Sequence, residues 1–280
     1  MINAPGYEET MHLISLAVKE DLGSGDVTSE AIFTENDVSA AAVLAKDEGV
    51  FCGSDMAVYV YRFIDPRVSV TPHVQDGMNV TSSTRVLSLD GPTRSLLAGE
   101  RIMLNFLQRL SGIATRTAFC VSLLRESGIQ LLDTRKTLPG FRALDKYAVA
   151  CGGGTNHRYG LYDMVMIKDN HIRAAGSIVE AVRIVREKYG ERYPVEVETT
   201  DMDEIQEALR AGADIIMLDN MDRHAIVKAS EAIRGRAKIE VSGNMDPGRI
   251  RELADCGIDY ISAGMLTHSV TAFDLSMKFI

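Results

Sequence analysis

The chain has 280 residues, and a composition of 46% hydrophobic and 25% charged residues is ordinary for a globular protein with a substantial core. No apolar run approaches the ~20 residues of a membrane span, and the start MINAPGYEETMHL lacks the features of a secretory signal peptide. The net charge of −9 offers no broad basic face for nucleic acid, and four scattered cysteines argue against a disulfide framework or a zinc site, so we expect a cytoplasmic protein.

The first hundred residues carry the signals of an α+β domain. Residues 7–22 have the spacing of an amphipathic helix, and the run GSGDVTSEAI that follows is turn-like. Residues 38–50, 58–70 and 79–89 indicate strands mixed with one helix.

Two helices are expected next, at residues 94–110 and, after Gly112, at residues 111–126. Arg101 shares one face of the first helix with Asn105 and Gln108, and from this pattern alone a solvated helix face is the ordinary interpretation.

From Ile129 onward, short apolar runs alternate with amphipathic helices. The runs are IQLLD, MVMIKD, PVEVET, DIIMLDN, KIEVSGN and YISAGM. Such one-strand, one-helix repeats predict a parallel sheet, either an open doubly wound sheet or a (β/α) barrel. We count about six or seven strands, which favours an irregular or open barrel.

Ligands of α/β proteins bind at the carboxyl ends of the parallel strands, so the residues that end each run should share one pocket. Glu198 and Asp219 are oxygen ligands suited to Mg²⁺. Ser242, Gly243 and Asn244 precede a helix near Pro247 and resemble an anion-binding loop, with Gly264 and His268 as a second wall. By strand alternation Glu196 shares the face of Glu198, as Glu240 shares that of Ser242, so each needs a partner, ligand or metal.

The segment from Asp133 to Arg173 holds seven Lys or Arg and four Asp, and is cationic in an acidic chain. Arg135 and Arg158 suit a carboxylate-bearing ligand, with Lys136 and Lys168 as point charges. The glycines at 152–154 allow a tight turn that directs His157 and Arg158 inward. Cys151 is a candidate catalytic thiol, although a small buried residue at a helix end is the commoner case.

Several motifs resemble quinolinate phosphoribosyltransferase, the carboxylating nicotinate-nucleotide pyrophosphorylase. They are EDLGSGDVTSEAI, ERIMLNFLQRLSGIAT, DTRKTLPGFRALDKYAV, GGGTNHRYGLYD, IKDNHI, ADIIMLDNM and GIDYISAGMLTHSV. The resemblance implies an N-terminal α+β sandwich domain, at 1–112 with the tail 270–280, and an irregular α/β barrel at 113–269. It also implies that quinolinate and phosphoribosyl pyrophosphate form nicotinate mononucleotide, pyrophosphate and CO₂, with Mg²⁺, in NAD biosynthesis.

Site roles follow from the resemblance. It implies that Arg135, His157, Arg158 and Lys168 surround the quinolinate carboxylates, and that Lys136 lies near the pyrophosphate. Glu198 and Asp219 would hold the ribose hydroxyls and Mg²⁺, and Ser242, Gly243, Asn244, Gly264 and His268 would line the 5-phosphate site. Lys136, Lys168, Glu198 and Asp219 form the expected catalytic group. Arg101 would reach in from the partner of a homodimer or higher oligomer, against its ordinary interpretation. The family usually has Gly at the position of Asn244, a residue that tolerates positive φ.

Three alternatives stay open at this stage. One is a related phosphoribosyltransferase paralogue with another carboxylated substrate, which is disfavoured because the IKDNH motif is kept. The second is a Schiff-base aldolase that uses Lys168 as its nucleophile. The third is a non-catalytic phosphometabolite-binding protein.

Overall fold

The computed structural model describes residues 4–280, and the chain divides into two compact units. The first unit comprises the chain up to Ala118 together with residues 138–153 and 269–280, and the second comprises residues 119–137 and 154–268. The sequence-based boundary at 112/113 thus differs from this division, chiefly because residues 138–153 group with the N-terminal unit.

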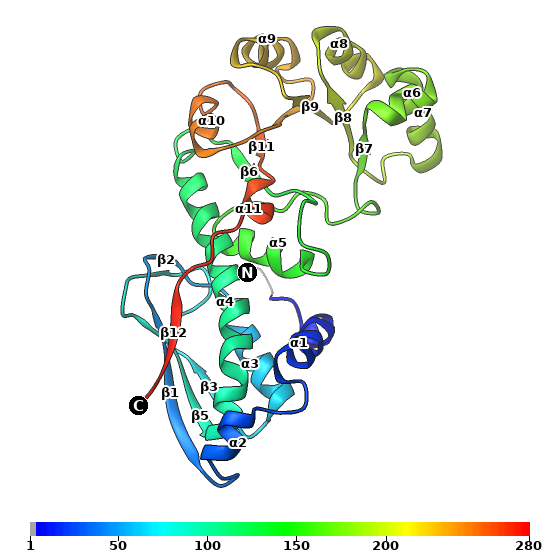
Figure 1. The fold of residues 1–280 in the computed structure, drawn as a ribbon. Helices are drawn as coiled ribbons and strands as arrows, with labels where there is room; N and C mark the ends of the chain where they lie inside the picture. Colours follow the sequence, from blue (N-terminus) through cyan, green and yellow to red (C-terminus); the bar gives the residue numbers. More distant parts are fainter. Residues whose placement is uncertain (1–3) are drawn as a thin grey trace. The chain divides into compact units, whose positions relative to one another are not determined.

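The first unit is built on a four-stranded antiparallel sheet in the order β12-β1-β5-β3. Its strands are β1 (Val38–Ala45), β3 (Ser69–Pro72), β5 (Arg85–Pro92) and β12 (Leu275–Phe279). The last strand of the chain pairs with the first, so the tail returns to this unit (Figure 1). The unit also contains the short pair β2 (Gly49–Val50) and β4 (Asn79–Val80), and the helices α1 (Tyr7–Leu22), α3 (Ser54–Ile64) and α5 (Arg142–Cys151).

Two sequence-based expectations for this region were wrong. The turn-like run contains a short helix, α2 (Val27–Ile32), which starts because the Asp26 carboxylate accepts hydrogen bonds from the N–H groups of Thr28 and Ser29. The two helices expected around Gly112 are one continuous helix, α4 (Thr93–Ser122). Gly112 does not end the helix. It allows the Thr271 carbonyl oxygen to approach closely, since a Cβ on Gly112 would lie 2.1 Å from that oxygen.

The second unit contains a six-stranded, wholly parallel sheet in the order β6-β11-β10-β9-β8-β7. The strands are β6 (Gln130–Leu132), β7 (Val165–Ile167), β8 (Val195–Thr199), β9 (Ile215–Asp219), β10 (Lys238–Ser242) and β11 (Tyr260–Ser262). Within residues 4–280, no ladder joins the edge strands β6 and β7, so this is the expected open form of the barrel.

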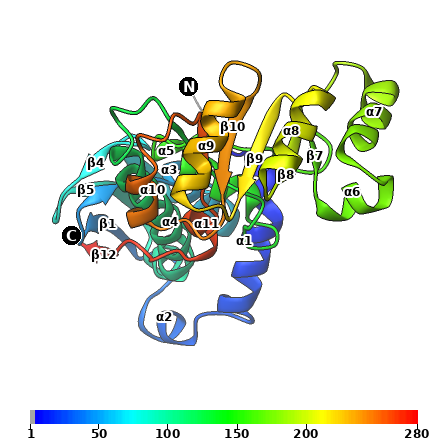
Figure 2. The ribbon, with the colours of Figure 1, turned by 90° about the horizontal axis from the view of Figure 1, so that it is seen from above.

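Helices of the second unit follow each of the strands β7 to β11, and Figures 1 and 2 show them passing along the sheet in chain order. They are α6 (Asp169–Ala175), α7 (Ile178–Tyr189), α8 (Met202–Ala211), α9 (Arg223–Ile233), α10 (Pro247–Glu252) and α11 (Met265–His268). Ser177, Asp201, Asp222 and Asp246 each accept a hydrogen bond from a first-turn backbone N–H, which explains where α7, α8, α9 and α10 begin.

Between residues 4 and 280, none of the helices combines the length and the apolar character that crossing a bilayer requires. None of the four cysteines, all within the described residues, forms a disulfide.

Candidate active site

One cavity of about 440 Å³ opens at the carboxyl ends of the parallel strands in the second unit. Ten of the residues singled out from the sequence line it, namely Arg135, Lys136, His157, Arg158, Lys168, Glu198, Asp219, Ser242, Gly243 and Asn244. They come from loops and strand ends between residues 135 and 244, and the parallel sheet brings them together because every strand ends at the same edge.

Four other candidates do not line the cavity, namely Gly264, His268, Arg101 and Cys151. Gly264 lies against the Lys136 stem, since a Cβ on it would come within 2.9 Å of Lys136 Cδ and 3.0 Å of His268 Cδ2. Gly264 and His268 are therefore grouped around Lys136. Arg101 is exposed on α4 in the other unit, and so is Asn105 on the same face. Cys151 also belongs to the first unit and does not line this cavity.

Sequence reasoning missed several lining residues. They are Asp133, Thr134, Met166, Met217, Asn220 and Ser262. Glu240, for which strand alternation predicted a partner, a ligand or a metal, also lines the cavity. Asn220 directly follows a strand-end residue, and Met166 and Met217 lie within strands, so a stricter use of strand ends and alternation would have found them. Asp133 is buried, and its Oδ1 accepts a hydrogen bond from the backbone N–H of His157 at 2.9 Å.

The arginines form a strongly cationic wall. Burial and the charge of Arg135 both lower the pKa of Arg158. Arg158 Nη1 donates to the Met164 carbonyl at 3.3 Å, which fixes the direction of its guanidinium. Two guanidinium groups that repel each other are stabilised by an anion between them, and a carboxylate matches their planar fork.

On the opposite side, Lys168 Nζ lies 3.0 Å from Glu198 Oε2. The lysine follows β7 and the glutamate lies on the neighbouring β8, so adjacent parallel strands set this pair. Asp219 ends β9, the next strand, and its Oδ2 accepts a hydrogen bond from Asn220 Nδ2 at 2.8 Å. The Lys168 ammonium and the carboxylates of Glu198 and Asp219 thus follow one another on the three adjacent strands β7, β8 and β9.

His157 connects the cavity with the core. Its Nε2 lies 3.2 Å from both Glu196 Oε2 and Glu240 Oε2, and these carboxylates are almost completely buried. Burial opposes a charge on the ring, but hydrogen bonds to both glutamates outweigh it and raise the pKa of His157 to about 9. Burial also raises the pKa of Glu196 to about 7.

A contact of the His157 ring with the backbone opposes its protonation. The Arg158 N–H points at His157 Nδ1 from 2.7 Å, an arrangement that favours a neutral imidazole. We take the charged ring as dominant, because two buried carboxylates without a cation are far more costly than one weakened local hydrogen bond.

The loop after β10 has the backbone of an anion-binding turn. Gly243 has φ +103° and Asn244 has φ +46°. A Cβ on Gly243 would lie 2.3 Å from Asn220 Oδ1, so only glycine fits there. Asn244 keeps the left-handed conformation that asparagine tolerates, and its Nδ2 donates to Asn220 Oδ1 at 3.3 Å. The Asp246 carboxylate caps the following helix α10, so loop N–H groups would serve an anion better than the helix terminus.

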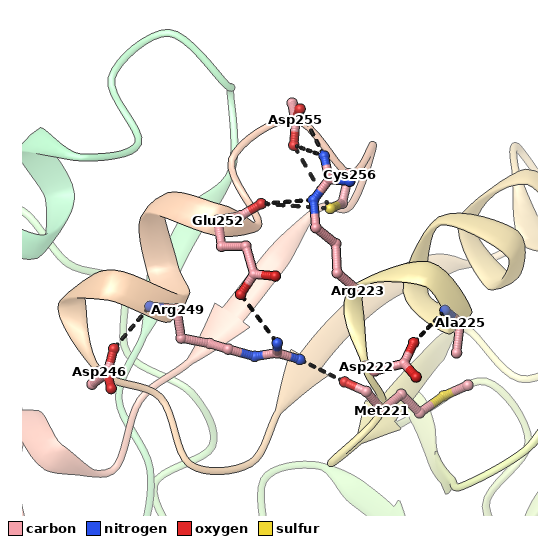
Figure 3. Close-up of polar contacts among 9 residues, drawn as sticks. All are labelled: Met221, Asp222, Arg223, Ala225, Asp246, Arg249, Glu252, Asp255 and Cys256. Atoms are coloured by element: carbon pink, nitrogen blue, oxygen red, sulfur yellow. Dashed lines mark hydrogen bonds and ion pairs between the residues drawn. The ribbon is translucent and has the colours of Figure 1, made fainter.

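Polar contacts join α10, the helix that follows this loop, to the segment after β9 and to α9 (Figure 3). Arg249 Nη2 on α10 donates to the Met221 carbonyl at 2.6 Å, and Arg223 Nη2 on α9 contacts both Asp255 oxygens at 2.8 and 2.9 Å. The segments that carry Asp219 and Asn244 therefore hold a fixed spacing.

These features together define an α/β enzyme with a site for a small polyanion, lined by two arginines, a Lys–Glu pair and a further carboxylate. Family models agree with this class. The quinolinate phosphoribosyl transferase C-terminal domain matches residues 113–278, and its N-terminal domain matches residues 26–111.

Individual relatives cover nearly the whole chain. A probable carboxylating nicotinate-nucleotide pyrophosphorylase of Bacillus subtilis is 43% identical over 92% of this chain and 89% of its own. The chloroplastic carboxylating enzyme of Arabidopsis thaliana is 41% identical over 95% of this chain and 81% of its own. The crystal structure of NadC from Streptococcus pyogenes has a TM-score of 0.95, 41% identity and 99% coverage of both chains. The chain belongs to the quinolinate phosphoribosyltransferase family.

Proposed function

We propose that the cavity in the second unit transfers the phosphoribosyl group of 5-phosphoribosyl-1-pyrophosphate to quinolinate. The products are nicotinate mononucleotide, pyrophosphate and CO₂, a step of NAD biosynthesis, which is the activity of the family. The observation that carries this proposal is that one cavity brings Arg135, Arg158 and the Lys168–Glu198 pair together with Asp219.

The cationic wall supports the binding of quinolinate, which carries two carboxylates on neighbouring ring positions. Arg135 and Arg158 would each form a bidentate pair, and Lys168 and His157 would add charge. Burial of the Arg158 guanidinium strengthens this contact, because a partly desolvated charge gains more from an opposite charge than an exposed one does.

The other half of the cavity suits the activated sugar. The Ser242–Gly243–Asn244 loop would bind the 5-phosphate, with Gly264 and His268 beside it, and Lys136 would lie near the pyrophosphate. Glu198 and Asp219 offer only oxygen atoms, a donor set that fits Mg²⁺ together with substrate phosphates and water. Mg²⁺ bound there would offset the negative charge of the pyrophosphate leaving group.

The protein groups then act by positioning and by charge. As the anomeric C–O bond breaks, the sugar gains oxocarbenium character, which the carboxylates of Glu198 and Asp219 stabilise. The Arg/Lys wall holds the quinolinate nitrogen in line for attack. Once that nitrogen is cationic, the bond from the adjacent ring carbon to its carboxylate breaks and CO₂ leaves. The electron pair stays on that ring carbon, which takes up a proton from solvent, while Arg135 or Lys168 retains the remaining carboxylate.

The decisive experiment is to incubate the protein with quinolinate, phosphoribosyl pyrophosphate and Mg²⁺ and to detect nicotinate mononucleotide by NMR or mass spectrometry. Nicotinate and other pyridine carboxylates serve as substrate controls and test the paralogue alternative. Product from another pyridine carboxylate alone would contradict the proposal. The aldolase alternative requires a neutral lysine, whereas Lys168 is paired with a carboxylate. The absence of turnover, with binding retained, would favour a non-catalytic binding protein.

We further propose a homodimer in which Arg101 completes the partner's site. Its exposed position on α4, outside the unit that contains the cavity, supports a role across an interface. Arg101→Ala and Arg135→Ala proteins should each be nearly inactive. Mixing them under conditions that exchange subunits should restore activity, because one site of each mixed dimer has both arginines. If the mixture remains as inactive as its components, Arg101 does not act in trans.

The proposal also places the protein in the cytoplasm. Four free thiols support this location, since an oxidising compartment favours disulfides.

A further inference from the structure

A second group of side chains able to ligate a metal belongs to the first unit and shares no residue with the cavity of the second. Cys52, Asp76 and Cys151 each offer one ligand atom, and the three atoms lie within 4.8 Å of one another. The sequence gave no sign of this group, because its members lie in three distant segments without a C-x-x-C spacing. We propose that they form a binding site for a thiophilic divalent cation of the zinc class.

The carboxylate is already held in a fixed orientation. Asp76 Oδ2 accepts hydrogen bonds from the Gly53 N–H at 2.8 Å and from the Tyr147 hydroxyl at 2.8 Å. Its Oδ1 accepts the Ser54 N–H at 3.0 Å, which uses one of the two lone pairs of this oxygen. Oδ1 therefore retains a lone pair for a metal, and hydrogen-bonded supports of this kind are typical of ligating carboxylates.

The two thiols lie on segments that are held by hydrogen bonds or by close packing. Cys52 is completely buried, and its backbone N–H and carbonyl both contact the Ser111 hydroxyl, at 3.0 and 3.1 Å. Cys151 ends α5 and is half-buried. The chain packs closely there, because a Cβ on Gly152 would lie 2.4 Å from the Ala114 carbonyl oxygen. The ligands are thus positioned before a metal arrives.

The geometry matches tetrahedral zinc. Bond lengths of about 2.3 Å to sulfur and about 2.0–2.2 Å to oxygen require ligand atoms roughly 3.5–3.8 Å apart, so small side-chain rotations suffice. Three protein ligands leave the fourth position for water. Asp76 and Tyr147 also line a surface pocket of about 420 Å³, which gives the ion a route of entry.

Charge favours a metal over a disulfide as the purpose of this group. A divalent cation draws on the charge of all three ligands, whereas a disulfide would use only the two sulfur atoms and leave the Asp76 carboxylate without an opposite charge. Binding converts two thiols to thiolates and releases two protons to solvent, which leaves the ion with two sulfur ligands and one carboxylate oxygen.

The test is to titrate the reduced, chelator-treated full-length protein with Co²⁺ in excess Mg²⁺. Cobalt–thiolate charge-transfer absorption reports sulfur ligands only, so the oxygen ligands Glu198 and Asp219 are silent. We expect a band that saturates at one equivalent and is bleached by Zn²⁺, which binds such sites more tightly than Co²⁺.

Variants assign the band to the site. Cys151→Ser should remove it, while Cys256→Ser, which changes a thiol outside the group, should retain it in full. Tyr147→Phe keeps all three ligands and removes one support of Asp76, so metal affinity should fall roughly 10- to 100-fold.

Three results would overturn the proposal. One is the absence of the band when thiol titration finds all cysteines reduced. Another is a band that persists unchanged in Cys151→Ser. The third is a Cys52–Cys151 disulfide, detected by mass spectrometry, in protein that takes up no cobalt, which would identify a redox pair instead.

Discussion

The buried trio of His157, Glu196 and Glu240 allows a quantitative prediction of stability. The side chains are 8%, 0% and 1% exposed, and one imidazole faces both carboxylates. The substitution His157→Ala leaves two carboxylates in a desolvated site with no cation. Removing one member of a buried ion pair destabilises a protein by about 3–5 kcal/mol, so we expect a loss of that size near neutral pH.

The loss should depend on pH with a definite sign. Without the imidazole, the folded state must keep carboxyls protonated, although their unfolded pKa is near 4.5. Holding one such proton costs about 0.7 kcal/mol at pH ~5 and about 4.8 kcal/mol at pH ~8, at 1.36 kcal/mol per unit. The triple variant His157→Ala, Glu196→Gln, Glu240→Gln carries no titratable group there and is the matched control.

Urea unfolding followed by circular dichroism at pH ~5 and pH ~8 provides the assay. His157→Ala should lie at least about 3 kcal/mol below the triple variant at the higher pH and approach it at the lower pH. Equal stability of the two variants at both pH values would refute the reasoning. In the unaltered protein, raised folded pKa values of about 9 for His157 and about 7 for Glu196 predict stability that declines as pH rises through these values.

Three further predictions concern single residues. Arg135→Ala should lower kcat/KM for quinolinate roughly 30- to 1,000-fold, which corresponds to a loss of about 2–4 kcal/mol of transition-state stabilisation. Near-normal steady-state kinetics would exclude the role of Arg135 in binding the carboxylate. Asn244→Gly should keep the KM for phosphoribosyl pyrophosphate within a small factor of that of the unaltered protein. Asn244→Ala should raise this KM, since alanine in the left-handed region costs about 1–2 kcal/mol. Equal KM values for the two variants would contradict this reasoning. Asp145→Asn should destabilise the protein by about 3–5 kcal/mol in urea unfolding, because it breaks the bidentate pair of a fully buried carboxylate with Arg109, at 3.0 and 2.8 Å. A loss below about 1 kcal/mol would mean that the pair is not a net contributor.

The sequence by itself determined the parallel sheet and most of the cavity. Apolar runs at one-strand, one-helix intervals allow few topologies, and parallel strands place their carboxyl ends at one edge. For this reason Lys168, Glu198, Asp219 and Ser242 could be grouped before any coordinates existed, and the structure places all four around one cavity.

Local patterns failed where a distant segment decides the outcome. Gly112 looks like a helix break, yet α4 continues through it, and the C-terminal segment passes too closely there for any side chain. The Asp26 cap turned an apparent loop into helix α2 through hydrogen bonds that composition alone does not specify.

Only the tertiary structure decided which buried charges meet. Strand alternation placed Glu196 and Glu240 on inward faces, but not His157 between them. The tertiary structure likewise brings together Cys52, Asp76 and Cys151, the first and last of which lie nearly one hundred residues apart in the sequence. Periodicity describes how a segment presents its side chains, whereas contacts between distant segments depend on how whole elements pack, and no short-range pattern carries that information.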